Sequence, residues 1–147
     1  PYLAELIAYV KETRPNAKIF LHETWAYAEK SGSLSKMNYK NHDEMYADVK
    51  KVYAQAAKEH DIDALIPAGR TMQLLYKSMD KIHRDDIHAN DIARFAIALT
   101  WYQMLTEKDI SKTDFSHLDF DERHTRKELK LAKKASVAAI KDTAYRR

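Results

Sequence analysis

The sharpest chemical signal in the sequence is an acid three residues before a histidine, Asp85 and His88. Both stand on a polar stretch that leads directly into an apolar run over residues 89–105. If Asp85 takes the Nδ1 proton of the imidazole, Nε2 of His88 is left free to act as a base on another group. The spacing therefore predicts a catalytic acid–base pair.

The same stretch has two other interpretations. Short acids and amides just before a helix are good N-cap residues, and this stretch holds several of them: Asp86, Asn90 and Asp91. Its carboxylates and imidazoles could instead bind a metal ion, with His83, Asp85, Asp86 and His88 as the donors. The metal interpretation is the weakest, because the further ligands that such a site needs cannot be named. We expect no metal and no cofactor.

A second group of candidates follows a predicted strand over residues 18–22. His22 ends this strand, and Glu23 and Trp25 come directly after it. Ligands in open α/β sheets bind beyond the carboxyl ends of the strands. We therefore predict that these three residues line a substrate cleft. The alternative for Trp25 is an anchor in the core or the loop.

The elements that position these candidates alternate between helical and strand patterns. Apolar spacing of three and four residues predicts helices, and short apolar runs bounded by turns predict strands. A polar loop with Ser31-Gly32-Ser33 at its centre separates the first strand from the next helix. The predicted helices are a first one starting at Leu3 and stopped by Pro15, 43–59 with Asp43 as N-cap, a turn over 71–78, 89–105 and 122–144 with Asp121 as N-cap; the strands are 18–22 and 61–66.

This order predicts an α/β fold with a parallel sheet. The strand over 18–22 reads as a central strand buried on both faces, yet the chain offers a neighbour on one side at most. Its other edge would be bare and apolar. The chain also opens at Pro1 without a methionine. We infer that more sheet comes from a missing N-terminal half or from a second polypeptide.

Composition places the chain among globular proteins. The 147 residues are 45% hydrophobic and 32% charged, and no apolar run is long enough to span a bilayer. Zero cysteines exclude a disulfide scaffold, a thiolate zinc site and a cysteine nucleophile, without fixing the compartment.

Charge divides the chain into an acidic body and a basic end. Between Glu122 and Arg147 there are nine basic and three acidic residues. The rest of the chain has 16 basic and 19 acidic residues. This bias lacks a recognisable nucleic-acid module, so no nucleic-acid partner is expected. We predict an α/β domain over 1–105, a linker over 106–120 and a basic peripheral helix over 121–147.

The motifs taken together resemble a known family. A strand end Leu21-His22-Glu23-Thr24-Trp25-Ala26-Tyr27-Ala28, a second end Ile66-Pro67-Ala68-Gly69, then Arg84-Asp85-Asp86-Ile87-His88 with Arg94-Phe95 and Trp101-Tyr102, follow in order. The order resembles the C-terminal half of the SGNH (GDSL-like) hydrolases, in a bacterial branch with a His/Gln-x-Thr-Trp-Ala-Tyr-Ala strand end. The resemblance covers residues 3–105.

The resemblance implies a flavodoxin-like three-layer α/β/α fold and a serine ester hydrolase. In that family an Asp-x-x-His pair completes a triad, which carries over to Asp85 and His88. The nucleophile would be a serine in a Gly-Asp-Ser block, and the oxyanion donors would also lie in the N-terminal half. This chain contains neither that block nor the Gly-x-Asn-Asp block. Its own loop serines follow the wrong strand for this role.

Two main hypotheses follow. The first is hydrolysis of O-acyl or acetyl esters, with a small-molecule or carbohydrate ester as the substrate. The second is a non-catalytic glycan-binding or scaffolding domain with an incomplete site, acting through the Trp25 loop. The resemblance leaves a periplasmic or secreted location open.

Overall fold

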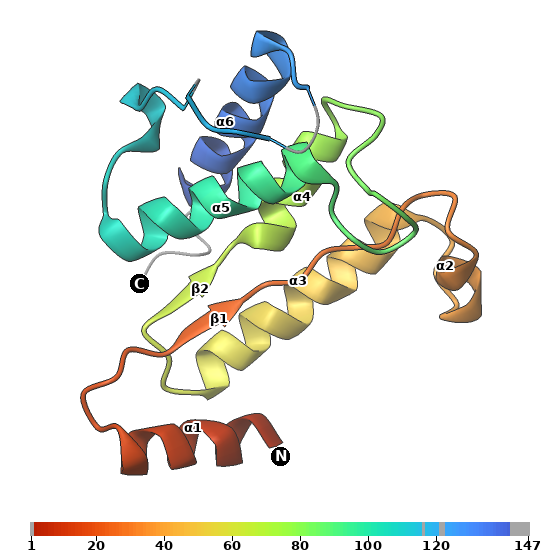
Figure 1. Cartoon of the computed structure of the whole chain (residues 1–147). Helices are drawn as coiled ribbons and strands as arrows, with labels where there is room; N and C mark the ends of the chain where they lie inside the picture. Colours follow the sequence, from red (N-terminus) through yellow and green to blue (C-terminus); the bar gives the residue numbers. More distant parts are fainter. Residues whose placement is uncertain (1, 116, 121–122, 142–147) are drawn as a thin grey trace.

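The computed structural model describes residues 2–115, 117–120 and 123–141. It has a mixed α/β fold with a small parallel sheet (Figure 1). In chain order the elements are α1 (Tyr2–Thr13), β1 (Phe20–His22), α2 (Gly32–Lys36), α3 (His42–Glu59), β2 (Ala64–Ile66), α4 (Ala68–Tyr76), α5 (Asp91–Thr106), the 3-10 helix η1 (Ile110–Lys112) and α6 (Arg126–Lys141).

The two strands pair in parallel, as the sequence predicts, with Phe20 opposite Ala64 and His22 opposite Ile66. Both are shorter than predicted, and the residues ahead of them are joined by one side-chain and one backbone hydrogen bond. The Ile19 amide donates to the Asp63 carboxylate at 2.6 Å, and the Asp63 amide donates to the Ile19 carbonyl at 2.8 Å.

β1 differs from the prediction of a strand buried on both faces. Its three residues are half-buried, and β2 is its one strand neighbour within the described part of the chain. β2 is more deeply placed, since it contacts both α3 and α5 and its Ile66 is fully buried. The free edge of β1 matches the expected bare edge.

The main core lies between α4, α5 and α6, which pack on one another (Figure 1). Buried hydroxyls cross this core. The Thr71 and Thr100 hydroxyls lie 2.8 Å apart, and the Ser136 hydroxyl donates to the Ala96 carbonyl at 2.8 Å. Each small polar side chain is hydrogen-bonded, so three helices meet without an unsatisfied hydroxyl.

The predicted linker and peripheral helix look different in the structure. Within 106–120, η1 buries Ile110 completely, so this segment packs on the domain. α6 begins at Arg126 and buries one face against α4 and α5. The predicted cap Asp121 and the predicted helix ends at 122 and 142–144 lie outside the described residues. The buried face consists of Ala132, Ala135, Ser136, Ala139 and Ile140.

Helix starts follow the capping chemistry closely. Asn41, two residues before the predicted cap Asp43, accepts the Glu44 amide and opens α3. Asn90, one of the predicted capping residues, accepts the Ala93 amide and opens α5. The serine-rich loop holds a short helix, α2, capped by Ser31. α4 begins at Ala68, directly after β2.

α1 lies apart from the main core (Figure 1). It buries Ile7 and half-buries Leu3 and Val10, while three large side chains face solvent: Tyr2 is 83% exposed, Leu6 59% and Tyr9 63%. Lys11 forms a solvent-exposed ion pair with Asp61. Among the described residues, no helix combines the length and hydropathy needed to cross a bilayer.

Candidate functional site

Asp85 and His88 form a closed turn between α4 and α5. Nδ1 of His88 lies 2.9 Å from Oδ2 of Asp85 and 3.1 Å from Oδ1. Oδ1 also accepts the amides of Ile87 and His88, at 2.8 and 2.7 Å. One carboxylate therefore fixes both the backbone of the turn and the orientation of the imidazole.

The electrostatics of this turn favour an ionised Asp85. Two backbone amides and the His88 side chain donate to the carboxylate, and together they hold the pKa of Asp85 well below its usual range. With Nδ1 engaged, Nε2 of His88 has no hydrogen-bond partner among the described residues. The His88 side chain is 62% exposed, so that nitrogen is accessible.

The predicted candidates on the two loops meet in the structure. The Trp25 indole donates to the Ile87 carbonyl at 2.9 Å, and the Ala28 amide donates to the Asp86 carbonyl at 2.9 Å. The loop after β1 is thus fastened to the Asp85–His88 turn. Trp25 is partly buried and its N–H is used in this bond, so it serves as an anchor between the loops.

His22 lies beneath this junction. Its ring stacks on Trp101 at 5.4 Å between centroids and meets the edge of Trp25 at 6.0 Å. The Trp101 indole donates to Nδ1 at 2.9 Å, so the neutral ring carries its proton on Nε2. Burial lowers the pKa of His22. Trp101 was not among the predicted site residues, because its apolar helix gave no sign that it would face β1.

Glu23 is fully buried, so it does not line an open cleft. Its carboxylate accepts the Arg70 amide at 2.9 Å, at the N-terminus of α4, where the helix dipole favours negative charge. The Gly69 amide donates to the Glu23 carbonyl at 3.1 Å. Glu23 therefore joins the end of β1 to the start of α4.

A histidine without a predicted role, His42, sits in a buried polar cluster. Its Nδ1 lies 2.7 Å from the Tyr27 carbonyl and its Nε2 lies 2.7 Å from Oε1 of Gln73. The ring stacks on Tyr76 at 4.3 Å. Tyr27 belongs to the same loop as Trp25, so this cluster supports the loop from behind. The partners of His42 are far from it in the sequence, so no local pattern could have predicted this cluster.

The four possible metal donors do not converge. Nε2 of His83 lies 3.1 Å from the Ala26 carbonyl, away from the Asp85–His88 contact. Burial lowers the pKa of His83. Within residues 2–115, 117–120 and 123–141, no group of three His, Asp or Glu side chains is arranged to hold a metal ion.

The comparisons with known proteins give one family. A crystal structure of a DUF4886 family protein from Bacteroides uniformis is 28% identical to this chain, with a TM-score of 0.86. The match covers 97% of this chain and 55% of that one, so this chain spans about half the length of its relative. No curated protein matches significantly. The family model described as a domain of unknown function (DUF4886) matches residues 2–139, and the chain belongs to that family.

Proposed function

We propose that Asp85 and His88 are the acid–base pair of an SGNH-type serine ester hydrolase, whose nucleophilic serine lies on a segment outside this chain. The observation that carries the proposal is the contact between Nδ1 of His88 and the Asp85 carboxylate, with Nε2 exposed. A base positioned by a carboxylate, with its second nitrogen accessible, is the arrangement that activates a hydroxyl nucleophile.

The reaction would run in two halves. Nε2 of His88 removes the serine proton as the serine oxygen attacks the ester carbonyl, and then gives that proton to the departing alcohol. Water attacks the resulting acyl-enzyme with His88 again as the base, which releases the acid and restores the serine. Asp85 holds the Nδ1 proton and stabilises the imidazolium that forms in each half.

The complete fold in this proposal is a flavodoxin-like three-layer domain. Three features support it: the parallel pairing of β1 and β2, the position of β2 between α3 and α5, and the free edge of β1. Additional parallel strands on that edge would bring the end of a first strand, where the family carries its serine, to the same side as His88. The length of the Bacteroides relative leaves room for such a segment.

We propose an O-acyl or acetyl ester as the substrate, with a carbohydrate as the alcohol. The half-exposed loop around Trp25 borders the Asp85–His88 turn and would contact the sugar. The second hypothesis, a non-catalytic glycan-binding or scaffolding domain, has less support. Its key residue Trp25 is already held by Ile87 and offers a smaller free surface to a sugar ring.

The test is active-site labelling of a longer protein of this family. That protein contains these 147 residues and has about the full length of the Bacteroides relative. A fluorophosphonate probe reacts with activated serines, and intact-mass spectrometry followed by peptide mapping locates the adduct. We expect a single adduct on a serine outside the present 147 residues. An adduct on Ser31, Ser33 or Ser35, or ester hydrolysis without any labelled serine, would contradict the proposal.

A further inference from the structure

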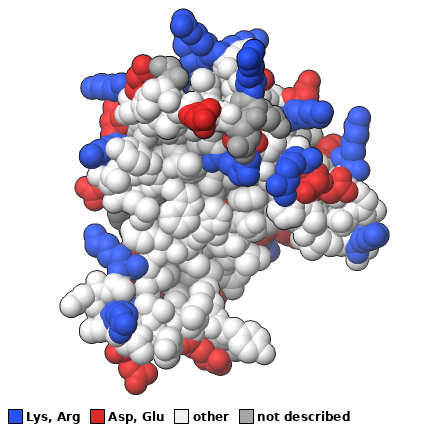
Figure 2. All heavy atoms as spheres, viewed as in Figure 1, with Lys and Arg blue, Asp and Glu red and all other residues white. Residues whose placement is uncertain are grey.

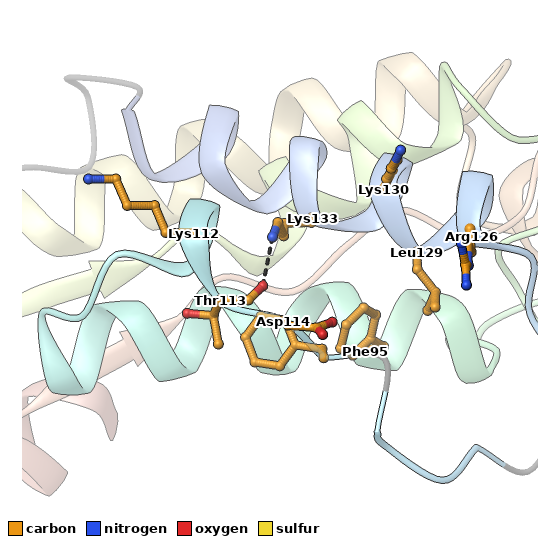
Figure 3. Close-up of a pocket in the computed structure, with 9 residues that line it drawn as sticks. Phe95, Lys112, Thr113, Asp114, Arg126, Leu129, Lys130 and Lys133 are labelled. Atoms are coloured by element: carbon orange, nitrogen blue, oxygen red, sulfur yellow. Dashed lines mark hydrogen bonds between the residues drawn. The ribbon is translucent and has the colours of Figure 1, made fainter.

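A cavity of about 510 Å³ lies between α6, the N-terminal part of α5, and the segment that follows η1 (Figure 3). Its volume is within the range of small-molecule sites. It shares no lining residue with the Asp85–His88 turn. Its walls are Phe95, Lys112, Thr113, Asp114, Phe115, Arg126, Leu129, Lys130 and Lys133.

The floor of this cavity is apolar and aromatic. Phe95 is buried, and its ring meets the Phe115 ring edge-on, at 5.8 Å between centroids and an angle of 76°. Leu129 of α6 is half-buried beside them (Figure 3). An aromatic or aliphatic body of a ligand could be desolvated here.

The rim is cationic. Lys112, Arg126, Lys130 and Lys133 line the cavity against one carboxylate, Asp114. Lys133 is held in place, because its ammonium donates to the Thr113 carbonyl at 2.7 Å and lies 5.9 Å from the centre of the Phe115 ring. Figure 2 shows several lysine and arginine side chains over the upper part of the molecule, where Figure 1 places α6, with acidic side chains among them.

A neighbouring cavity of about 380 Å³ continues this surface along α6. It shares Lys130 and Lys133 with the first and adds two more lysines, Lys134 and Lys141. Lys112 lies near the Asp109 carboxyl and helps to lower its pKa. Within the described chain, the other two cations of the larger cavity's rim besides Lys133, Arg126 and Lys130, have no ion-pair partner. Their positive charge is therefore available to a ligand.

From these observations we propose that the larger cavity binds an amphiphilic organic anion. Its head group would be a carboxylate, sulfonate or phosphate held by Arg126 and Lys133, and its body would be an aromatic or aliphatic group packed on the three apolar side chains. This site is independent of the esterase proposal, because none of its residues belongs to the Asp85–His88 turn or the Trp25 loop.

The test uses three probes that separate head from body. The amides of the folded protein are followed by NMR during titration with 2-naphthalenesulfonate, with methanesulfonate as the head alone and 2-naphthalenemethanol as a neutral body. We expect the naphthalenesulfonate to bind most tightly and to shift the amides of Thr113, Phe115, Leu129 and Lys133.

Matched double variants test the charges. Arg126→Gln with Lys133→Gln removes two cations from the cavity, and Lys108→Gln with Lys127→Gln removes two lysines that line neither cavity. The first pair should weaken naphthalenesulfonate binding about fivefold to tenfold, and the second by less than about twofold. Amide spectra and melting curves verify that both pairs remain folded.

Three results would overturn the proposal. Equal losses in the two double variants would mean that the anion senses only the general positive surface. Shifts centred on the exposed face of α1 would place the probe on a different apolar surface. If methanesulfonate bound as tightly as 2-naphthalenesulfonate, the apolar floor would contribute nothing to binding.

Discussion

Asp85 combines two tasks in a single turn. Its Oδ1 accepts two backbone amides, which fix the turn, while Oδ2 approaches the imidazole of His88 at 2.9 Å. A residue that only capped the turn would need no imidazole on its second oxygen. Asp85 therefore fixes the turn and orients the histidine at the same time.

The carboxylate of Asp85 should stay ionised in acid. The pKa of Asp85 is lowered by the two amides and by His88, whereas an unfolded aspartate has a pKa of about 3.9. Its contribution to stability is therefore complete above about pH 4 and is lost as the pH falls toward the lower folded value. Carbon-13 NMR of the carboxylates should show Asp85 still charged below the pH at which an unperturbed aspartate protonates.

Asp85→Asn and Asp86→Asn are the matched variants for this prediction. Asp85→Asn should remove the carboxylate signal that stays charged at low pH, and it should make the free energy of unfolding depend less on acid. Asp86→Asn should leave that signal and the acid dependence of stability unchanged. An ordinary titration of Asp85, near pH 4, would show that the turn is open in solution.

His88→Ala should abolish ester hydrolysis in the extended chain. Loss of the general base in a serine triad lowers kcat by about 10³-fold to 10⁶-fold. The side chain is largely exposed, so the melting temperature should scarcely change. His117→Ala, at another exposed histidine, is the control, and steady-state hydrolysis of an acetyl ester is the measurement. Unchanged turnover in His88→Ala would show that His88 takes no part in the reaction.

At the scale of elements, the close approach of β1 and α4 depends on Gly69. A Cβ at this position would overlap the Thr24 carbonyl oxygen and lie 3.1 Å from two carbons of the Glu23 side chain. Gly69→Ala should destabilise the fold by roughly 1–3 kcal/mol, because backbone must move. Chemical denaturation measures the change in the free energy of unfolding.

Gly32→Ala is the control for the same substitution. A Cβ there meets no atom within 4 Å, and Gly32 opens the short helix α2. Alanine should be neutral or stabilising by up to about 1 kcal/mol. Equal losses at both glycines would indicate a general effect of alanine and not the contact with Glu23.

The sequence predicts the helices and strands that depend on local patterns. The apolar spacing in α3 and α5, and the amides Asn41 and Asn90 at their starts, are local signals, and these helices begin within two residues of prediction. The Asp85–His88 contact is local too, since three residues separate its partners. α6 differs, because an alanine stripe is equally suited to a surface helix and to close packing, and only α4 and α5 decide between them.

The rest of the site depends on contacts between distant segments. Trp25 meets Ile87 across 62 positions, and Trp101 meets His22 across 79. The sequence placed Trp25 near a strand end but could not show that its N–H would be used by the other loop. Glu23 had the same position in the pattern, and the start of α4 buries it.

For the whole molecule, two apolar features stay uncovered among the described residues: the edge of β1 away from β2, and the exposed side chains of α1. Tyr2, Leu6 and Tyr9 are exposed on α1, and Phe20 and Leu21 are half-buried in β1. Large apolar side chains on a helix and a bare strand edge both favour coverage by further chain.

Hydrogen exchange tests this coverage. In the 147-residue chain, the amides on the outer edge of β1 should exchange rapidly, and in a chain extended to the length of the Bacteroides relative they should be protected by about 10³-fold or more. The amides of α5 serve as the internal control, since α5 lies in the core in both chains. Equal exchange at β1 in the two chains would show that the extension does not complete the sheet.

The aromatic contacts of His22 have one more consequence. The chain has two tryptophans, Trp25 and Trp101, and both contact this single imidazole. Charged imidazole quenches indole emission, and burial keeps the pKa of His22 low. The tryptophan emission of the chain therefore comes entirely from two side chains that contact His22 at the end of β1. It gives an optical signal, without any label, for protonation or ligand binding at the point where the two loops meet.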